Sequence, residues 1–173
     1  KHFIFEWQSS VKSRVSGNGC PYLSKPVKAI HPGFNDLATT HPKLLEEWDY
    51  EKNKISPTEI SAGSATKVWW KKKHYDSKNN KYIYLEWEAT IANRINGRNC
   101  PYLSTRNKKV LAGFNDLATT HPELIKEWNY EKNIISPTEV SKGSNKKVWW
   151  KLEYYDKKTD KNYIFEWEAT INN

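Results

Sequence analysis

Apolar and polar residues alternate in two neighbouring stretches of this chain, and the same arrangement returns near its end. Residues 67–70 read Lys-Val-Trp-Trp, and residues 82–90 read Tyr-Ile-Tyr-Leu-Glu-Trp-Glu-Ala-Thr. Between them, residues 76–81 are rich in Asp, Lys and Asn, which favour turns. The pattern therefore predicts two strands joined as a β-hairpin.

A helix is expected before the hairpin. Leu44, Leu45 and Trp48 form one apolar face at helical spacing. Thr40-His41-Pro42 precedes them, and proline is well tolerated in the first turn of a helix. The spacing predicts one helix from Thr40 to about Tyr50, and the second copy, Thr120 to Glu123, has the spacing of a capping box. Residues 93–103 are expected to close the unit as a turn or short helix.

The whole pattern repeats after 80 residues. From Phe34 to Asp76, 31 of 43 residues equal those 80 positions later, so tandem folding units are expected. Residues 32–111 make one complete unit, residues 1–31 correspond to the C-terminal part of a unit, and residues 112–173 to the N-terminal part. This division fits either a window from a longer array or a protein with two incomplete terminal units.

The amino-acid composition indicates how the units are stabilised and which partners and compartment to expect. A unit of about 80 residues usually needs a metal, a disulfide or a neighbour, and 9 Trp, 10 Tyr and 5 Phe partly meet that need. The net charge of +8 makes a polyanion the first partner class to consider. Two cysteines, one in each copy, suggest a reducing compartment. With neither a membrane-spanning run nor a signal pattern, we expect a cytoplasmic protein, with nucleoid, nucleus or viral particle as alternatives, and no membrane partner.

Several short motifs, taken in order, resemble one family. They are Asp-Leu-Ala-Thr-Thr-His-Pro, Tyr-Glu-Lys-Asn, Ser-Pro-Thr-Glu, Val-Trp-Trp-Lys, Glu-Trp-Glu-Ala-Thr-Ile and Cys-Pro-Tyr. This order resembles the treble-clef, zinc-ribbon repeat domain and covers essentially the whole chain. The resemblance implies an α+β fold of small tandem treble-clef-like units, each with a helix, a β-hairpin and a short closing helix or turn.

In that family a Cys after the tryptophan pair, a His before Glu-Trp and two Cys of a closing Cys-Pro-Tyr-Cys would hold one zinc ion. The resemblance places these ligands at Lys72, Leu85, Cys100 and Leu103 of the complete unit. A single thiolate cannot hold a structural zinc, so we predict degenerate, metal-free units without a cofactor. We expect Leu85, Cys100 and Leu103 to form an apolar cluster instead, braced by a long hairpin turn from Lys71 to Tyr82.

The other copies depart from the ligand pattern in the same way. They carry Leu152 at the first ligand position, Phe5 and Phe165 at the second, Cys20 at the third and Leu23 at the fourth. His41 and His121 could supply a distant ligand. The Thr-His-Pro context favours local capping of a helix instead.

The paired tryptophans are candidates for contact with a partner. Adjacent strand residues point to opposite faces, so Trp69 and Trp70 cannot both enter one core. An exposed Trp of each pair, beside Lys71–Lys73, would suit base stacking. Burial of both members is the alternative, and a small unit favours it.

Basic side chains gather locally, whereas acidic ones gather on the predicted helix. The basic groups include Lys12 with Arg14, Lys146 with Lys147, and Arg106 with Lys108 and Lys109. A lysine-rich solvated surface would show the same pattern, but an arginine fork can pair with phosphate. The candidate nucleic-acid contacts are Arg14, Arg94, Arg98, Lys71, Lys72, Lys73, Trp70 and Trp150.

No phosphate-cradling glycine motif and no catalytic Cys-His or Ser-His-Asp spacing occurs, so we expect no enzymatic activity. The favoured function is nucleic-acid binding by a basic, Trp-rich array, with DNA preferred over RNA. One alternative is a protein-interaction or structural module of a phage, viral or ribonucleoprotein assembly, whose partners are neighbouring units or other chains. Another is the targeting region of a larger nuclease.

Overall fold

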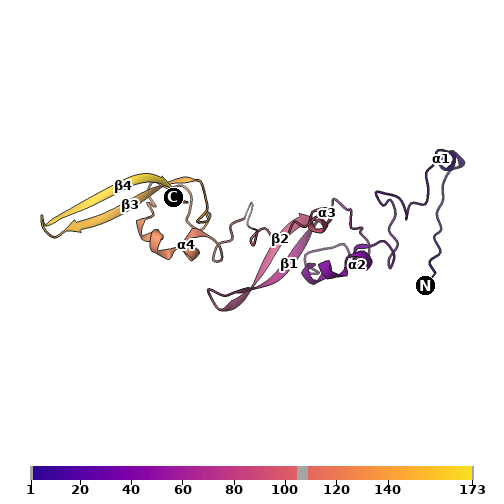
Figure 1. Ribbon diagram of the computed structural model, residues 1–173, viewed down its shortest axis with the longest axis horizontal. Coiled ribbons are helices and arrows are strands. Elements are labelled where there is room, and N and C mark those ends of the chain that lie inside the picture. Colours follow the sequence, from indigo (N-terminus) through magenta and orange to yellow (C-terminus); the bar gives the residue numbers. More distant parts are fainter. Residues whose placement is uncertain (1, 105–108, 173) are drawn as a thin grey trace. The chain divides into compact units, whose positions relative to one another are not determined.

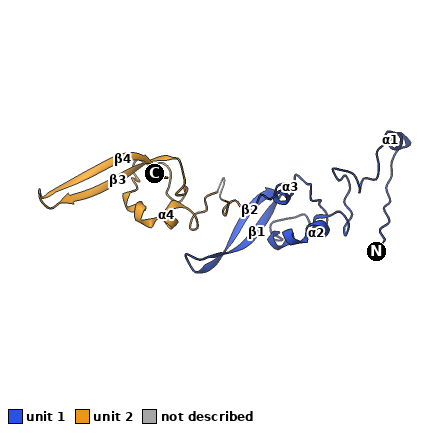
Figure 2. Ribbon diagram, viewed as in Figure 1, with its two compact units in different colours: residues 1–100 blue, residues 101–173 orange. Residues whose placement is uncertain are grey.

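The computed structural model describes residues 2–104 and 109–172 (Figure 1). The chain divides into two compact units, Lys1–Cys100 and Pro101–Asn173, called unit 1 and unit 2 below (Figure 2). The boundaries inferred from the 80-residue repeat stay a prediction. Arg106 and Lys108 of one predicted basic group lie outside the described residues.

Short helices and long hairpins make up both units, which gives the expected small α+β fold. The elements of unit 1 are α1 (Val11–Val15), α2 (Leu37–Thr40), the 3-10 helix η1 (Pro42–Glu47), β1 (Lys67–Asp76), β2 (Lys81–Thr90) and α3 (Ile91–Ile95). Those of unit 2 are α4 (Leu117–Thr120), the 3-10 helix η2 (Pro122–Glu127), β3 (Lys147–Asp156) and β4 (Lys161–Thr170). No helix among the described residues is long and apolar enough to cross a membrane.

The helix predicted from Thr40 to about Tyr50 is present only from Pro42 to Glu47, as the 3-10 helix η1, and a separate short helix, α2, precedes it. The elements α2 and η1 meet at His41, whose φ of −138° and ψ of 59° are not helical. Pro42 explains the break because the residue before a proline is disfavoured in the α region. The predicted capping box is also wrong, since His121 takes the N-cap position of η2 and its side chain caps nothing.

Asp36 caps α2 instead, and Asp116 caps α4 in the same way. The Asp36 carboxylate accepts hydrogen bonds from the backbone N–H of Thr39 (2.8 Å), from Thr39 Oγ1 (2.7 Å) and from the N–H of Gly33 (2.6 Å). Burial alone would raise the pKa of this carboxyl, but the hydrogen bonds outweigh burial and hold the pKa below its ordinary 3.8. The pKa of Asp116 is lowered for the same reasons.

We expect both units to lose stability in acid through these two caps. Because the folded pKa values lie below 3.8, the carboxylates stabilise the fold at higher pH, and this contribution disappears as the pH falls through the folded values. The double variant Asp36→Asn, Asp116→Asn keeps a capping residue type and should unfold with a shallower pH dependence below about pH 4. Near-UV circular dichroism from about pH 7 to about pH 2 measures the pH dependence of unfolding. If the double variant and the exposed-site control Glu46→Gln both unfolded with the same pH dependence as the parent chain, the prediction would be contradicted.

The hairpins are longer than the sequence indicated. Strand β1 pairs with β2 in antiparallel register from Lys67↔Thr90 to Asp76↔Lys81. The prediction of a long turn from Lys71 to Tyr82 is therefore wrong. Only residues 77–80 connect the strands, and Asn80 takes a φ of 48°, a left-handed conformation that asparagine tolerates.

The register defines two faces of each hairpin. The inner face of β1–β2 carries Val68, Trp70 and Lys72 opposite Ala89, Trp87 and Leu85. The outer face carries Trp69, Lys71 and Lys73 opposite Glu88, Glu86 and Tyr84. On the inner face of β3–β4 lie Val148, Trp150, Leu152 and Tyr154 opposite Ala169, Trp167, Phe165 and Tyr163.

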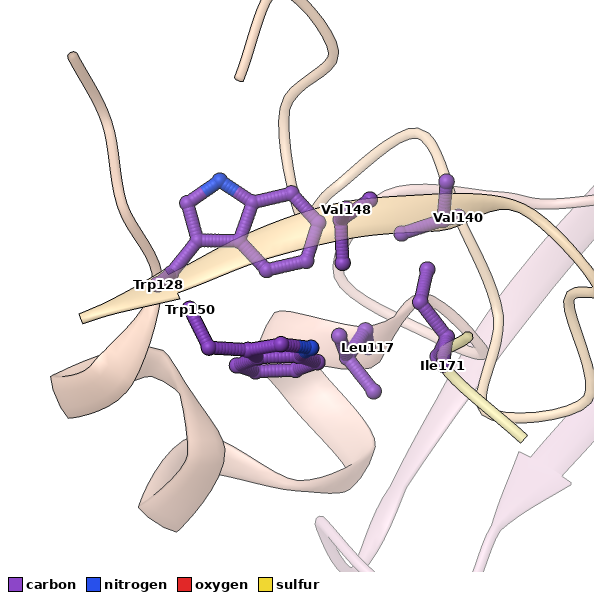
Figure 3. Close-up of a cluster of buried hydrophobic side chains, with 6 residues drawn as sticks. All are labelled: Leu117, Trp128, Val140, Val148, Trp150 and Ile171. Atoms are coloured by element: carbon purple, nitrogen blue, oxygen red, sulfur yellow. The ribbon is translucent and has the colours of Figure 1, made fainter. Parts of the chain in front are cut away.

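The core of each unit forms where the inner face meets the short helices. In unit 2 the Trp128 and Trp150 rings lie edge to face, with centroids 5.5 Å apart (Figure 3). Their neighbours in this buried cluster are Leu117, Val140, Val148 and Ile171. Unit 1 buries the equivalent residues, Leu37, Trp48, Ile60, Val68, Trp70 and Ile91. The core therefore fixes which tryptophan of each pair points inward.

Candidate functional site

Trp70 and Trp150, the predicted stacking residues, are core residues. Trp70 is fully buried, and its indole Nε1 donates a hydrogen bond of 3.1 Å to the Ala89 carbonyl. Trp150 is 6% exposed. Neither ring can stack on a base, so their assignment as nucleic-acid contacts is wrong. Residues two positions apart in a strand point to the same face, so Trp70 and Trp150 lie on the same side as the buried Val68 and Val148.

Arg94, another predicted contact, also lies inside unit 1. Its guanidinium pairs with the Glu47 carboxylate and donates to the carbonyl of Arg98 (3.0 Å). The guanidinium carbon lies 5.1 Å from the centre of the Trp70 ring and 5.4 Å from that of Trp87. Only 4% of the Arg94 side chain is exposed. The prediction that Arg94 contacts a phosphate is wrong, because Glu47 already satisfies its charge.

Lys72 extends the same network from the inner face. Its ammonium group pairs with the other carboxylate oxygen of Glu47 at 2.6 Å. One glutamate therefore holds two cations, Lys72 from β1 and Arg94 from α3. This ties the hairpin, η1 and the closing segment together, so Lys72 stabilises unit 1 and is not free for a polyanion.

The outer face presents the other tryptophan of each pair. Trp69 and Trp149 are half-buried. In unit 1 an asparagine that follows η1 holds the strand here: Asn53 accepts from the Trp69 N–H at 2.8 Å and donates to the Trp69 carbonyl at 2.8 Å. Lys52 lies over the Trp69 ring at 4.4 Å, and Lys132 over Trp149 at the same distance. Half-buried tryptophan rings beside lysines are a combination that suits contact with nucleic acid.

Ion pairs with carboxylates partly neutralise the lysines on the outer face of unit 1. Lys71 contacts Glu51 at 3.1 Å and Glu86 at 3.6 Å, and Lys52 also pairs with Glu86. The hydrogen bond to Glu51, with the charges of both glutamates, raises the pKa of the Lys71 ammonium. Lys73 lies over the Tyr82 ring at 4.4 Å. Of the predicted lysine cluster, Lys73 is thus the member that stays exposed on the outer face.

Unit 2 adds a hollow beside its outer tryptophan. Its lining residues are Lys132, Asn133, Ile134, Ile135, Glu139, Lys146, Lys147 and Trp149. Lys146 and Lys147 are exposed, whereas Lys132 bonds to Glu166 at 2.5 Å and lowers the pKa of that carboxyl. The hollow is shallow and open, and it combines an indole ring with two exposed lysines, with Lys132 already paired to Glu166 and with the carboxylate residue Glu139. Exposed lysines beside a tryptophan suit a phosphate next to a base.

The two remaining arginines of the predicted set are exposed. Arg98 follows α3, and its carbonyl accepts the hydrogen bond from Arg94. Arg14 occupies the repeat position of Arg94, yet its guanidinium donates to the Asn18 carbonyl at 2.7 Å and lies 5.9 Å from the Trp7 ring. Both guanidinium groups remain accessible to a partner.

Comparison with family models identifies two matching regions, residues 44–104 and 124–173. The family is described as "Probable Treble clef zinc finger domain". The chain belongs to this family. A comparison with curated proteins found no match. The treble-clef resemblance read from the motifs is thereby confirmed.

The residues at the family's zinc positions do not fit a zinc ion. Lys72 and Leu85 face each other across the hairpin, at the positions where the sequence resemblance places a Cys and a His. Leu85 and Cys100 are buried, as an apolar cluster would require, whereas Leu103 is 36% exposed, so the expectation that all three side chains are buried together is wrong for Leu103. In residues 2–104 and 109–172, His, Cys, Asp and Glu form no group of three that could hold a metal. The single thiol offers one ligand of the four that zinc requires.

Sequence reasoning selected the wrong member of each tryptophan pair and missed Lys52 and Lys132, which lie over Trp69 and Trp149. The alternation of residues along β1 carried the signal. Val68 and Trp70 are two positions apart and share one face of the strand, while Trp69, Lys71 and Lys73 share the other face. Placing the apolar valine in the core assigns Trp69 to the lysine face. The position of Lys52, from a loop 17 residues earlier, required the structure.

Proposed function

We propose that the chain binds nucleic acid through the outer faces of its hairpins, without catalysing a reaction, and prefers DNA to RNA. The carrying observation is the half-buried Trp149 in a hollow lined by Lys132, Lys146 and Lys147. Trp69 with Lys52 repeats the pairing of ring and cation in unit 1. Arg98, Lys73 and the net charge of +8 add cations that can contact phosphate.

Binding is expected to weaken steeply with salt. If about five phosphates are engaged, the logarithm of the association constant should fall with the logarithm of salt concentration at a slope of about −4 to −5. Fluorescence anisotropy of labelled duplex DNA, single-stranded DNA and RNA across a salt series measures both the slope and the preference. A slope near zero would eliminate the proposal.

Variants can distinguish binding at the hollow from attraction by the net charge of the chain. The double variant Lys146→Ala, Lys147→Ala should reduce the slope by about 2. Trp149→Ala should weaken single-strand binding by about 1–3 kcal/mol with the slope retained. The matched control is Lys157→Ala, Lys158→Ala, which removes the same charge from the exposed turn of β3–β4. Equal losses in both lysine pairs would show that net charge, and not the hollow, governs binding.

A further inference from the structure

The turn end of the β1–β2 hairpin carries three exposed tyrosines on its outer face. Tyr75 lies opposite Tyr82, and Tyr84 lies opposite Lys73. The exposed fractions of Tyr75, Tyr82 and Tyr84 are 46%, 63% and 59%. Because this end of the hairpin extends away from α2 (Figure 1), the core of unit 1 does not cover these rings. We call Lys73, Tyr75, Tyr82 and Tyr84 the tyrosine patch.

Lysines lie against the faces of two of these rings. The Lys73 ammonium group is 4.4 Å from the centre of the Tyr82 ring, and that of Lys71 is 5.2 Å from the centre of the Tyr84 ring. Lys71 is already paired with carboxylates. None of the ion pairs within residues 2–104 and 109–172 includes Lys73. The charge of Lys73 is therefore available to a phosphate beside exposed aromatic rings.

Unit 2 lacks the tyrosine patch. Three of the four repeat positions hold an acidic, an amide and an aliphatic side chain, which are Glu153, Asn162 and Ile164. Strands β3 and β4 nevertheless pair over the same length and in the same register as β1 and β2. The hairpin therefore forms without these rings, which favours a binding role for them in unit 1.

The spacing of the rings distinguishes between kinds of nucleic acid. Tyr82 and Tyr84 are two residues apart on one face of β2, which separates their positions by roughly 7 Å. Along one strand of a duplex, successive nucleotides are only about 3.4 Å apart, and their bases lie inside the helix. Rings at the wider spacing suit the unpaired bases of an extended single strand, to which aromatic side chains bind by stacking.

We propose that the tyrosine patch binds single-stranded nucleic acid, with unpaired bases stacked on Tyr82 and Tyr84 and a phosphate in contact with Lys73. Lys73 can leave the face of the Tyr82 ring, because an exposed contact between a cation and a ring is worth only about 0.5–1 kcal/mol. The inference rests on the proposed function and adds to it that unit 1 selects unpaired strands, whereas unit 2 has no such patch.

The double variant Tyr82→Asn, Tyr84→Ile tests the proposal, because it gives unit 1 the side chains that unit 2 carries and leaves the charge unchanged. Fluorescence anisotropy should show that its affinity for labelled oligothymidine falls at least about tenfold. Its affinity for duplex DNA should change by less than about twofold, because the lysines that contact phosphate are kept. The matched control Tyr155→Leu removes an exposed tyrosine from the turn end of β3–β4 and should bind both probes like the parent chain.

An abasic oligomer of the same length separates stacking from charge, since it keeps the phosphates and lacks the bases. The parent chain and the double variant should bind it equally. Equal losses of affinity for oligothymidine and for the abasic oligomer would overturn the proposal. Unchanged affinity for oligothymidine, with the β1 and β2 amides exchanging at the parent rate, would also overturn it and would leave the patch to a protein partner.

A reciprocal variant keeps the test decisive if the double variant loosens unit 1. Asn162→Tyr, Ile164→Tyr in unit 2 should tighten the binding of oligothymidine and leave that of the abasic oligomer unchanged. Absence of this gain would then overturn the proposal. A chain that binds duplex DNA with the expected salt dependence but fails these tests loses only this inference, whereas a chain that binds neither duplex nor single strand loses the proposed function as well.

Discussion

Trp70→Ala is expected to unfold unit 1 while unit 2 stays folded. The ring is fully buried, packs edge to face on Trp48 at 5.5 Å and lies beneath the Arg94 guanidinium. Removing such a side chain costs about 3–5 kcal/mol, a large share of the roughly 5–15 kcal/mol by which a domain is stable. Hydrogen exchange read by mass spectrometry resolves the two units, so amides of β1 and β2 should exchange faster while those of β3 and β4 keep the parent rate.

The neighbouring tryptophan provides the matched control. Trp69 lies on the outer face and is half-buried under Lys52. Trp69→Ala should therefore cost unit 1 much less, about 1 kcal/mol, and should act on nucleic-acid binding instead. Equal acceleration of exchange in the two variants would contradict the assignment of inner and outer faces.

The hairpins, the helix region and the family could be predicted because each rests on a local pattern. Alternation in residues 82–90 and the polar turn locate the strands. The turn length was misjudged, because the lysines of β1 resemble loop residues when their aromatic cross-strand partners are not considered. In the structure Lys73 lies over Tyr82, and the Tyr75 and Tyr82 rings are 5.1 Å apart. These pairings make residues 71–76 strand.

The roles of individual charges could not be read from local pattern. Arg94 and Arg98 are four residues apart, yet one is buried and the other exposed. What separates them is Glu47, which is 47 residues away from Arg94 in sequence and reaches it only through the fold. Arg14 matches Arg94 in the repeat but is exposed, and among the described residues no carboxylate pairs with it as Glu47 pairs with Arg94.

Glu47→Gln is expected to destabilise unit 1 by about 3 kcal/mol, since removing one partner of a buried ion pair leaves the other charge without compensation. The expected loss of stability lies at the lower end of the range for broken buried ion pairs, because Arg94 keeps hydrogen bonds to the Arg98 carbonyl and to Asn99 Oδ1. Chemical denaturation followed by exchange of the β2 amides measures the change. A loss of this size would mean that the ion pairs of Glu47 supply part of the bracing that a metal ion gives to a small zinc-binding domain.

Two further variants test whether the loss comes from the ion pair of Glu47 with Arg94. Glu127→Gln changes the same residue type at the same repeat position in unit 2, where the described residues give the carboxylate no cation. Glu127→Gln should cost unit 2 at most about 0.5 kcal/mol. The double variant Glu47→Gln, Arg94→Met removes both charges and should recover much of the loss, because an apolar side chain of similar length can fill the space between Trp70 and Trp87. If Glu47→Gln and Glu127→Gln had equal effects, the carboxylate of Glu47 would not be the link that joins Lys72 to Arg94, and unit 1 would depend on its aromatic core alone.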